Sequence, residues 1–104
     1  MNWKIQYSEK SLEDLEAIHN YISNVLLAKT TANMQIERIM QFIDTLAEMP
    51  LRHPAHDEEP WKSKGIRFFA IGNYLVFYLP DKKTNSVKII RIMYGKRSFP
   101  DKNS

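Results

Sequence analysis

Basic and aromatic side chains gather in the C-terminal half of the sequence, where their spacing suits recognition of an anion. They are Lys62, Lys64, Arg67, Tyr74, Arg91, Tyr94, Lys96 and Arg97. Cations interleaved with aromatic rings can contact phosphates and stack against bases, and they can equally bind an acidic peptide. The alternative is an ordinary solvated strand face. We assign a binding role to Tyr94, Lys96 and Arg97, and we favour the solvated face for Lys62, Lys64 and Lys88.

Other familiar chemistry is missing from the sequence. The chain has no cysteine, which excludes a thiol nucleophile, and it lacks the GxSxG, P-loop, HExxH and GxGxxG motifs. His53 and His56 stand beside acids in a proline-interrupted segment that rarely presents a preformed ligand set, so we expect no metal and no cofactor. His19 is predicted to be structural, and Asp14 to serve the electrostatics of a helix start. Spacing alone assembles no nucleophile, base and orienting group.

Charge divides the chain into two unlike halves. Residues 1–60 hold five Lys and Arg against ten Asp and Glu, whereas residues 61–104 hold ten against two. The basic half therefore suggests an anionic partner, although two halves that complement each other within one fold would look the same.

The length of 104 residues predicts a single domain over residues 1–104. Without an apolar leader or an apolar run near the roughly 20 residues of a membrane span, we expect a soluble, cytoplasmic protein.

The stretch from residue 65 to residue 97 predicts three antiparallel strands, because it is dense in Ile, Val, Phe and Tyr. The strands are expected at 66–71, 74–79 and 87–94. Gly72 and Asn73 form the first turn, and a polar loop opens at Pro80, which cannot donate to a strand ladder.

Residues 2–7 alternate apolar and polar side chains and predict a short edge strand. Two helices follow, with Ser8 or Ser11 as the first cap and Thr30 or Thr31 as the second. Their predicted apolar stripes are Leu12, Leu15, Ile18, Ile22 and Val25, then Ala32, Ile36, Ile39, Met40, Ile43 and Leu46. Residues 50–64 are predicted to form an irregular connection, with Trp61 folding back onto the core. The expected fold is α+β, a twisted antiparallel sheet in the order β-α-α-β-β-β with the helical hairpin on one face.

From about Trp3 to Phe99 the sequence resembles the RelE/ParE superfamily of toxins from type II toxin–antitoxin systems. The segments GIRFFAIGNYLVFY at 65–78 and VKIIRIMYGKR at 87–97 carry most of the resemblance, and the two helices add to it. The resemblance implies a growth-inhibiting toxin, neutralised by a cognate antitoxin in a hetero-oligomer. The partner is expected to cover exposed apolar residues with an acidic, amphipathic segment. It further implies that Arg67, Tyr74, Arg91, Tyr94, Lys96 and Arg97 contact the target or the antitoxin.

The superfamily has two kinds of target, DNA gyrase for ParE-like members and mRNA on the ribosome for RelE-like members. The RelE-like pattern places an arginine where this chain has Tyr74, and it has an acid–base or stacking side chain in a tail that here reads SFPDKNS. Arg67 and Arg97 match the nuclease pattern, and Tyr94 is the nearby hydroxyl. The sequence therefore favours gyrase, with a ribosome-dependent endoribonuclease using Arg67, Tyr94 and Arg97 as the alternative. A small basic binding module without toxicity is a third reading.

Overall fold

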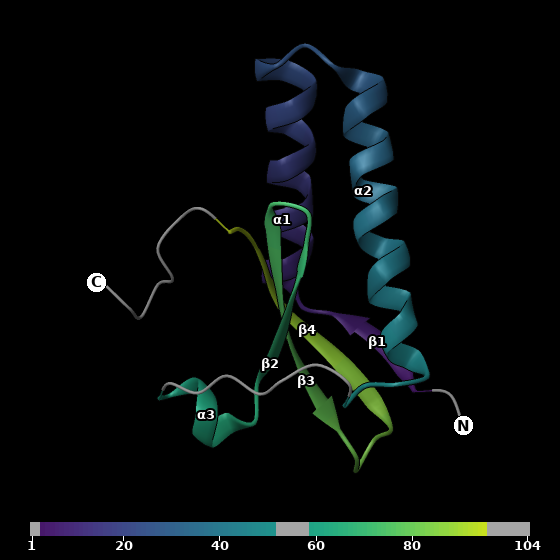
Figure 1. Cartoon of the computed structure of the whole chain (residues 1–104), viewed down its shortest axis with the longest axis vertical. Coiled ribbons are helices and arrows are strands. Elements are labelled where there is room, and N and C mark those ends of the chain that lie inside the picture. Colours follow the sequence, from purple (N-terminus) through teal and green to yellow (C-terminus); the bar gives the residue numbers. More distant parts are fainter. Residues whose placement is uncertain (1–2, 52–58, 96–104) are drawn as a thin grey trace.

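The computed structural model describes residues 3–51 and 59–95, in which a helical hairpin stands over a twisted four-stranded sheet (Figure 1). Strand β1 is Lys4–Tyr7. Helix α1, Glu9–Asn20, continues into a π-helical turn, η1, at Tyr21–Val25. Helix α2, Lys29–Asp44, ends in the 3-10 turn η2, Thr45–Ala47. A short helix α3, Trp61–Lys64, precedes strands β2, Arg67–Ile71, β3, Tyr74–Asp81, and β4, Ser86–Tyr94. The predicted α+β class, element order and helical hairpin are confirmed, with α3 as an addition inside the expected connection.

The sheet is mixed rather than wholly antiparallel, because its first strand runs parallel to its last. The strand order is β1-β4-β3-β2, with antiparallel pairs β2–β3 and β3–β4. Strand β1 pairs with β4 in parallel register from Lys4 with Ser86 to Tyr7 with Ile89. Strand β1 is an edge strand, as predicted.

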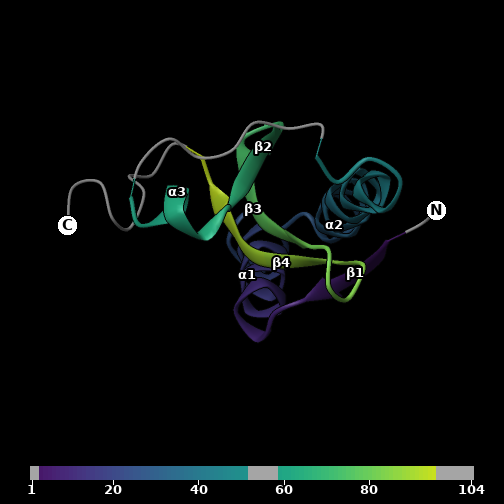
Figure 2. The ribbon, with the colours of Figure 1, turned by 90° about the horizontal axis from the view of Figure 1, so that it is seen from below.

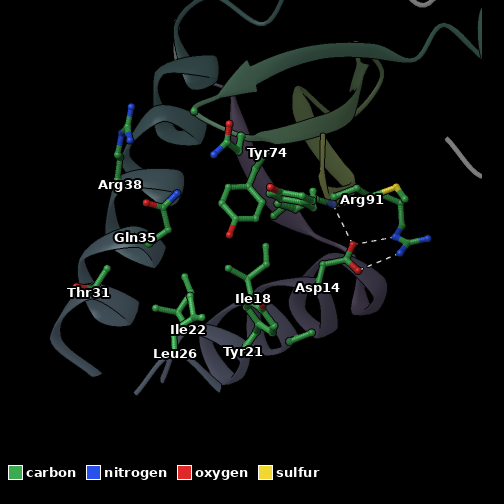
Figure 3. A pocket seen from close by; sticks show the side chains of 16 residues that line it. Asp14, Ile18, Tyr21, Ile22, Leu26, Thr31, Gln35, Arg38, Tyr74 and Arg91 are labelled. Carbon is green, nitrogen blue, oxygen red and sulfur yellow. Dashed lines mark hydrogen bonds and ion pairs between the residues drawn. The ribbon is translucent and has the colours of Figure 1, made fainter. Parts of the chain in front are cut away.

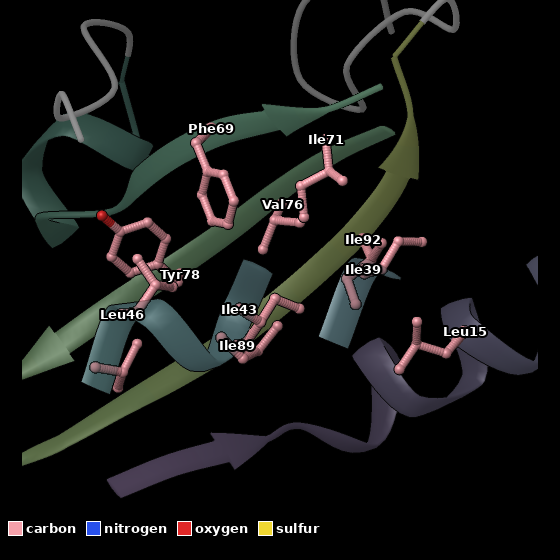
Figure 4. Close-up of a cluster of buried hydrophobic side chains, with 11 residues drawn as sticks. Leu15, Ile39, Ile43, Leu46, Phe69, Ile71, Val76, Tyr78, Ile89 and Ile92 are labelled. Atoms are coloured by element: carbon pink, nitrogen blue, oxygen red, sulfur yellow. The ribbon is translucent and has the colours of Figure 1, made fainter. Parts of the chain in front are cut away.

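The hydrophobic core lies between the helices and one face of the sheet (Figure 4). Helix α2 contributes Ile39 and Ile43, and α1 contributes Leu15, all of them buried. From the sheet come Phe69, Ile71, Val76, Tyr78, Val87, Ile89 and Ile92. Burial of apolar area on this scale is the main stabilising term of the fold.

The helical hairpin is longer than the sheet it covers, so its tip projects beyond the β2–β3 turn (Figure 1). Several large apolar side chains near the tip are therefore exposed, namely Tyr21, Val25, Leu26, Leu27 and Met34, and Leu27 is 84% exposed. The predicted stripes are wrong at Leu12, Val25 and Met40, which are exposed. The spacing of the apolar residues predicts which face of each helix is apolar. It does not predict how far the sheet extends beneath that face.

Two local predictions also need correction. Strand β3 continues through Pro80, which pairs with Val87. Strand β2 begins at Arg67, opposite Tyr78. Beyond Tyr78, β4 is therefore the one strand that pairs with β3 among the described residues, and a proline is tolerated in such an edge segment. Trp61 does fold back, and its ring stacks on Phe77 with centroids 6.1 Å apart.

The helix caps follow the prediction in part. Ser8 caps α1, and its side-chain oxygen accepts a hydrogen bond from the amide of Ser11 at 3.0 Å. Helix α2 instead begins at Lys29, after Ala28 and without a side-chain cap, so neither predicted threonine caps it. Across residues 3–51 and 59–95, none of the helices combines the length and apolar character needed to cross a bilayer.

Tyr7, at the end of β1, should make stability fall at high pH. Burial, reinforced by the nearby Asp44 carboxylate, raises the pKa of Tyr7 to about 12. The native state thus holds this proton more tightly than the unfolded chain does, whose tyrosine pKa is near 10. The resulting stabilisation is complete below pH 10 and disappears as the pH rises through 12.

Tyr7→Phe tests this linkage. Urea unfolding of the variant is expected to lose less free energy between pH 9 and 12 than the native protein does. At pH 7 the variant should be as stable or slightly more so, because the buried Tyr7 hydroxyl has no hydrogen-bond partner within the described residues. Tyr21→Phe, at an exposed ring, is the control. Identical pH profiles for Tyr7→Phe and the native protein would contradict the assignment.

Candidate functional site

A cavity of about 880 Å³ lies below the overhanging part of the hairpin (Figure 3). Helices α1 and α2 form two of its walls, and the β2–β3 turn with the end of β4 forms the third. Its lining comprises Asp14, Ala17, Ile18, Tyr21, Ile22, Leu26, Thr31, Gln35, Arg38, Gly72, Asn73, Tyr74, Arg91, Ile92, Met93 and Tyr94. Three of the predicted site residues, Tyr74, Arg91 and Tyr94, thus meet in one place.

Two tyrosines mark the sheet side of the cavity. Tyr74 and Tyr94 are directly paired across β3 and β4, and their rings meet edge to face with centroids 5.8 Å apart. Burial, then the neighbouring Tyr94 and Tyr21, raise the pKa of Tyr74, so its hydroxyl stays protonated and can donate a hydrogen bond. In Figure 3 the Tyr74 ring points into the space between the two helices.

The turn next to Tyr74 is held in place by the chain that leaves β4. Gly72 has a φ of 59°, in the left-handed region where glycine is favoured. The carbonyl of Asn73 accepts a hydrogen bond from the amide of Gly95 at 2.6 Å. The turn and the end of β4 therefore form one fixed corner of the cavity.

Asp14 joins α1 to β4 at the bottom of the cavity. Its carboxylate accepts two hydrogen bonds from the Arg91 guanidinium, at 2.8 and 3.0 Å, and one from the amide of Ile92 at 2.9 Å. Strand β1 ends opposite Ile89, so Asp14 takes over part of the β4 edge beyond it. Hydrogen bonding to Asp14 raises the pKa of Arg91. Arg91 therefore has a structural partner in Asp14. The predicted contact of Arg91 with the target or the antitoxin stays a prediction.

Arg38 supplies positive charge on the opposite wall. Its side chain is exposed on α2, and the guanidinium lies 5.9 Å from the centre of the Phe42 ring. Within residues 3–51 and 59–95 the ion pairs join Lys88 to Asp81 and Arg91 to Asp14. Arg38 is in neither pair, so this part of the chain gives it no carboxylate.

Two of the three residues of the nuclease alternative, Arg67 and Tyr94, lie apart in the sheet, and the third, Arg97, is outside the described residues. Arg67 pairs with Tyr78, whereas Tyr94 pairs with Tyr74. Tyr74 and Tyr78 are four positions apart along β3, which at strand spacing is roughly 13 Å. The Arg67 guanidinium donates to the carbonyl of Leu51 at 3.4 Å.

The remaining predicted residues fall in three places. Lys62 and Lys64 are exposed on α3, and Lys88 lies 3.4 Å from Asp81; these positions match the solvated face favoured for them. Lys96 and Arg97, like His53 and His56, lie outside the described residues. Among the described residues, no group of three His, Cys, Asp or Glu side chains could hold a metal.

Sequence reasoning did not assign Gln35, Arg38 or the tip residues to a site. Arg38 lies between Ile36 and Ile39 in the sequence but outside the apolar stripe of α2, at an exposed position, and a lone cation there offers little signal. The place of Asp14 in the first turns of its helix predicts a helix-start charge, and its partner Arg91 is 77 positions away, so no local pattern indicates the ion pair.

The comparison with protein families identifies the chain. Residues 5–99 match the family described as the ParE toxin of the type II toxin–antitoxin system, parDE. This protein belongs to the ParE toxin family. The predicted RelE/ParE resemblance is therefore confirmed. The protein is a toxin of a type II toxin–antitoxin system, and the cavity and the end of β4 are features of that toxin.

Solved structures agree on the ParE fold. A structure titled as the chromosomal ParDE system from P. aeruginosa has a TM-score of 0.73 at 18% identity, covering 88% of this chain and 95% of that one. The RelBE2 toxin–antitoxin complex from Mycobacterium tuberculosis gives 0.67 at 18% identity, with coverage of 90% and 99%. The isolated E. coli RelE toxin gives 0.58 at 11% identity, with coverage of 92% and 87%. At these identities the likeness concerns the fold alone. No curated protein sequence matches this chain.

Proposed function

We propose that this protein arrests growth by binding and poisoning DNA gyrase, without chemistry of its own, and that a cognate antitoxin neutralises it. The ParE family match over residues 5–99 is the observation that carries this proposal. It agrees with the sequence, in which Tyr74 stands where the nuclease pattern has an arginine. The contacts we assign to the target are the helical hairpin and the cationic end of β4.

The geometry also favours binding over cleavage. Cleavage of RNA by its 2′-hydroxyl needs charge stabilisation and proton transfer around one phosphate. Arg67 lies at the start of β2, opposite Tyr78, whereas Tyr94 of β4 lies opposite Tyr74, next to the β2–β3 turn. Arg91 is paired with Asp14. The ribosome-dependent endoribonuclease thus remains the second candidate, tested below together with the first.

An antitoxin partner is part of the same proposal. Two of the structures that share the fold are described as toxin–antitoxin systems, ParDE and RelBE2. The exposed apolar tip of the hairpin supports a partner here, because apolar patches left bare favour aggregation. We expect a short partner, encoded next to this protein, with an acidic amphipathic segment.

Pulse-labelling in growing cells separates the two targets. After induction without a partner, incorporation of labelled thymidine is expected to fall before incorporation of labelled methionine, and full-length transcripts should persist. The reverse order, with transcripts cut inside translated codons, would support the endoribonuclease and reject gyrase. Undisturbed growth at high expression would reject both and favour a harmless binding module.

A further inference from the structure

We propose that the tip of the helical hairpin enters an uncharged, apolar recess of the target protein, and that Leu27 is the residue that fills this recess. The tip patch consists of Val25, Leu26 and Leu27, which are exposed where the chain passes from α1 to α2. Val25 and Leu27 lie outside the lining of the cavity described above. The inference rests on the proposed function for the identity of the target, DNA gyrase.

Leu27 has a backbone conformation that a bulky side chain disfavours. Its φ is 54°, in the left-handed region that suits glycine and asparagine. Hydrogen bonds on either side fix this bend. The amide of Leu26 donates to the carbonyl of Tyr21 at 3.2 Å, and the amide of Ala28 donates to that of Ile22 at 3.1 Å. Glycine is the usual residue just after the last turn of a helix that ends in this way, so a leucine at this position does not serve the turn.

The Leu27 side chain does not serve the core either, since it is 84% exposed. A residue with an unfavourable backbone conformation and an unburied side chain weakens the isolated fold, and such outliers cluster at functional sites. The π-helical turn Tyr21–Val25 just before it is a second irregularity of a kind that is frequent at functional sites. The position of Leu27 therefore points to a contact outside this chain.

The charge of the tip selects the kind of occupant. Residues 20–36 contain no Asp or Glu, and Lys29 is their one Lys or Arg, whereas 26% of the whole chain is charged. A nucleic acid or an anionic lipid surface is bound through several cations, which the tip lacks. An uncharged tip instead matches an uncharged recess in a protein.

The shape of the tip favours a larger target over a second copy of this chain. The hairpin projects beyond the β2–β3 turn, so its end is convex (Figure 1). Two convex tips that met would bury little more than the tip patch of each, well short of the roughly 1,200 Å² of a stable interface. A recess in the target can enclose the same side chains, as an addition to the proposed contact at the cationic end of β4.

Substitutions at Leu27 separate a target contact from a structural role. Asparagine suits the left-handed backbone, so Leu27→Asn should leave Tm unchanged or raise it. The same variant should raise the concentration that half-inhibits supercoiling by purified gyrase about fivefold or more, because no apolar side chain then enters the recess. Leu27→Met keeps an apolar side chain of similar volume and should stay within about twofold of the native protein.

Asn85→Gly is the matched control. Asn85 is the other described non-glycine residue with a positive φ, 50°, and it is exposed in the turn between β3 and β4. This turn lies at the opposite end of the molecule from the tip (Figure 1), so Asn85→Gly should leave inhibition unchanged. Equal inhibition by Leu27→Asn and the native protein would overturn the proposal, as would reduced inhibition accompanied by a lower Tm.

Two further measurements test the other occupants. If Leu27→Asn inhibits gyrase fully but loses binding to the protein encoded next to this one, the tip belongs to the antitoxin. If the native protein sediments as a dimer that Leu27→Asn dissociates, again with full inhibition, the tip belongs to a second copy. Either result would overturn the proposal.

Growth arrest separates this inference from the proposed function. If the native protein leaves supercoiling unchanged, the proposed action on gyrase fails. Loss of growth arrest by Leu27→Asn alone would then support the tip as a contact with another protein target. Equal growth arrest by the variant and the native protein, or none by either, would overturn the inference as well.

Discussion

Asp14→Ala is expected to lower the free energy of unfolding by about 3 kcal/mol, the largest stability effect of any charged residue in the described chain. The variant loses three hydrogen bonds of 2.8 to 3.0 Å that tie α1 to β4. It leaves the Arg91 guanidinium without its counter-ion and the Ile92 amide without an acceptor. An unsatisfied buried amide alone costs about 1–3 kcal/mol.

The ion pair is partly shielded, which places the expected cost between surface and core values. The Arg91 side chain is 31% exposed and that of Asp14 15%. Fully exposed pairs contribute about 0.2–1 kcal/mol, and breaking a fully buried pair costs about 3–5 kcal/mol. In a domain of this size a loss of about 3 kcal/mol should lower Tm by more than 10 °C.

Urea unfolding of three variants measures this contribution. Asp14→Asn should fall between Asp14→Ala and the native protein, since an amide oxygen can still accept from Ile92. Glu16→Ala, at an exposed position on the same helix, is the control and should change stability by less than about 0.5 kcal/mol. If Asp14→Ala were no more destabilising than Glu16→Ala, the proposed link between α1 and β4 would be wrong.

Replacing Lys96 and Arg97 together by glutamine is expected to raise the concentration that half-inhibits gyrase at least tenfold and to abolish growth arrest. These cations follow Tyr94 and Gly95 at the end of β4, where the proposed target contact is made. Removing charges from such a contact lowers the association rate as well as the affinity. Partial proteolysis and thermal unfolding should be unchanged if the fold does not depend on them.

The control for this variant is Lys82→Gln with Lys83→Gln. Both lysines are exposed in the turn between β3 and β4, at the end of β4 opposite Tyr94, and their loss changes net charge by the same amount. Equal inhibition by the two double variants would mean that only total charge matters. Full inhibition by the Lys96 and Arg97 variant would remove this end of β4 from the target contact.

The sheet half of this fold is predictable because its signals are local. Strands β2 and β3 and the Gly72 turn follow from the density of β-branched and aromatic residues and from glycine chemistry over a dozen residues. The parallel pairing of β1 with β4 joins positions more than 80 apart, and no local pattern encodes it. The overhang of the hairpin likewise depends on where the sheet ends.

The candidate site is less predictable than the fold. The cations around Tyr74 and Tyr94 predict a recognition role for both tyrosines, and the structure pairs them on one face of the sheet. The cavity beside them needs α1, α2 and the β2–β3 turn at once, so the wall that α2 forms with Gln35 and Arg38 does not follow from the sequence. Arg91 looked like a free strand cation because its partner, Asp14, lies in another element.

Supercoiling by purified DNA gyrase in the presence of this protein tests the central claim most directly. The account predicts that a micromolar excess of the protein inhibits supercoiling and traps cleaved plasmid, and that the neighbouring partner protein restores activity. Unchanged supercoiling at that excess, with the same preparation cutting mRNA on translating ribosomes, would contradict it.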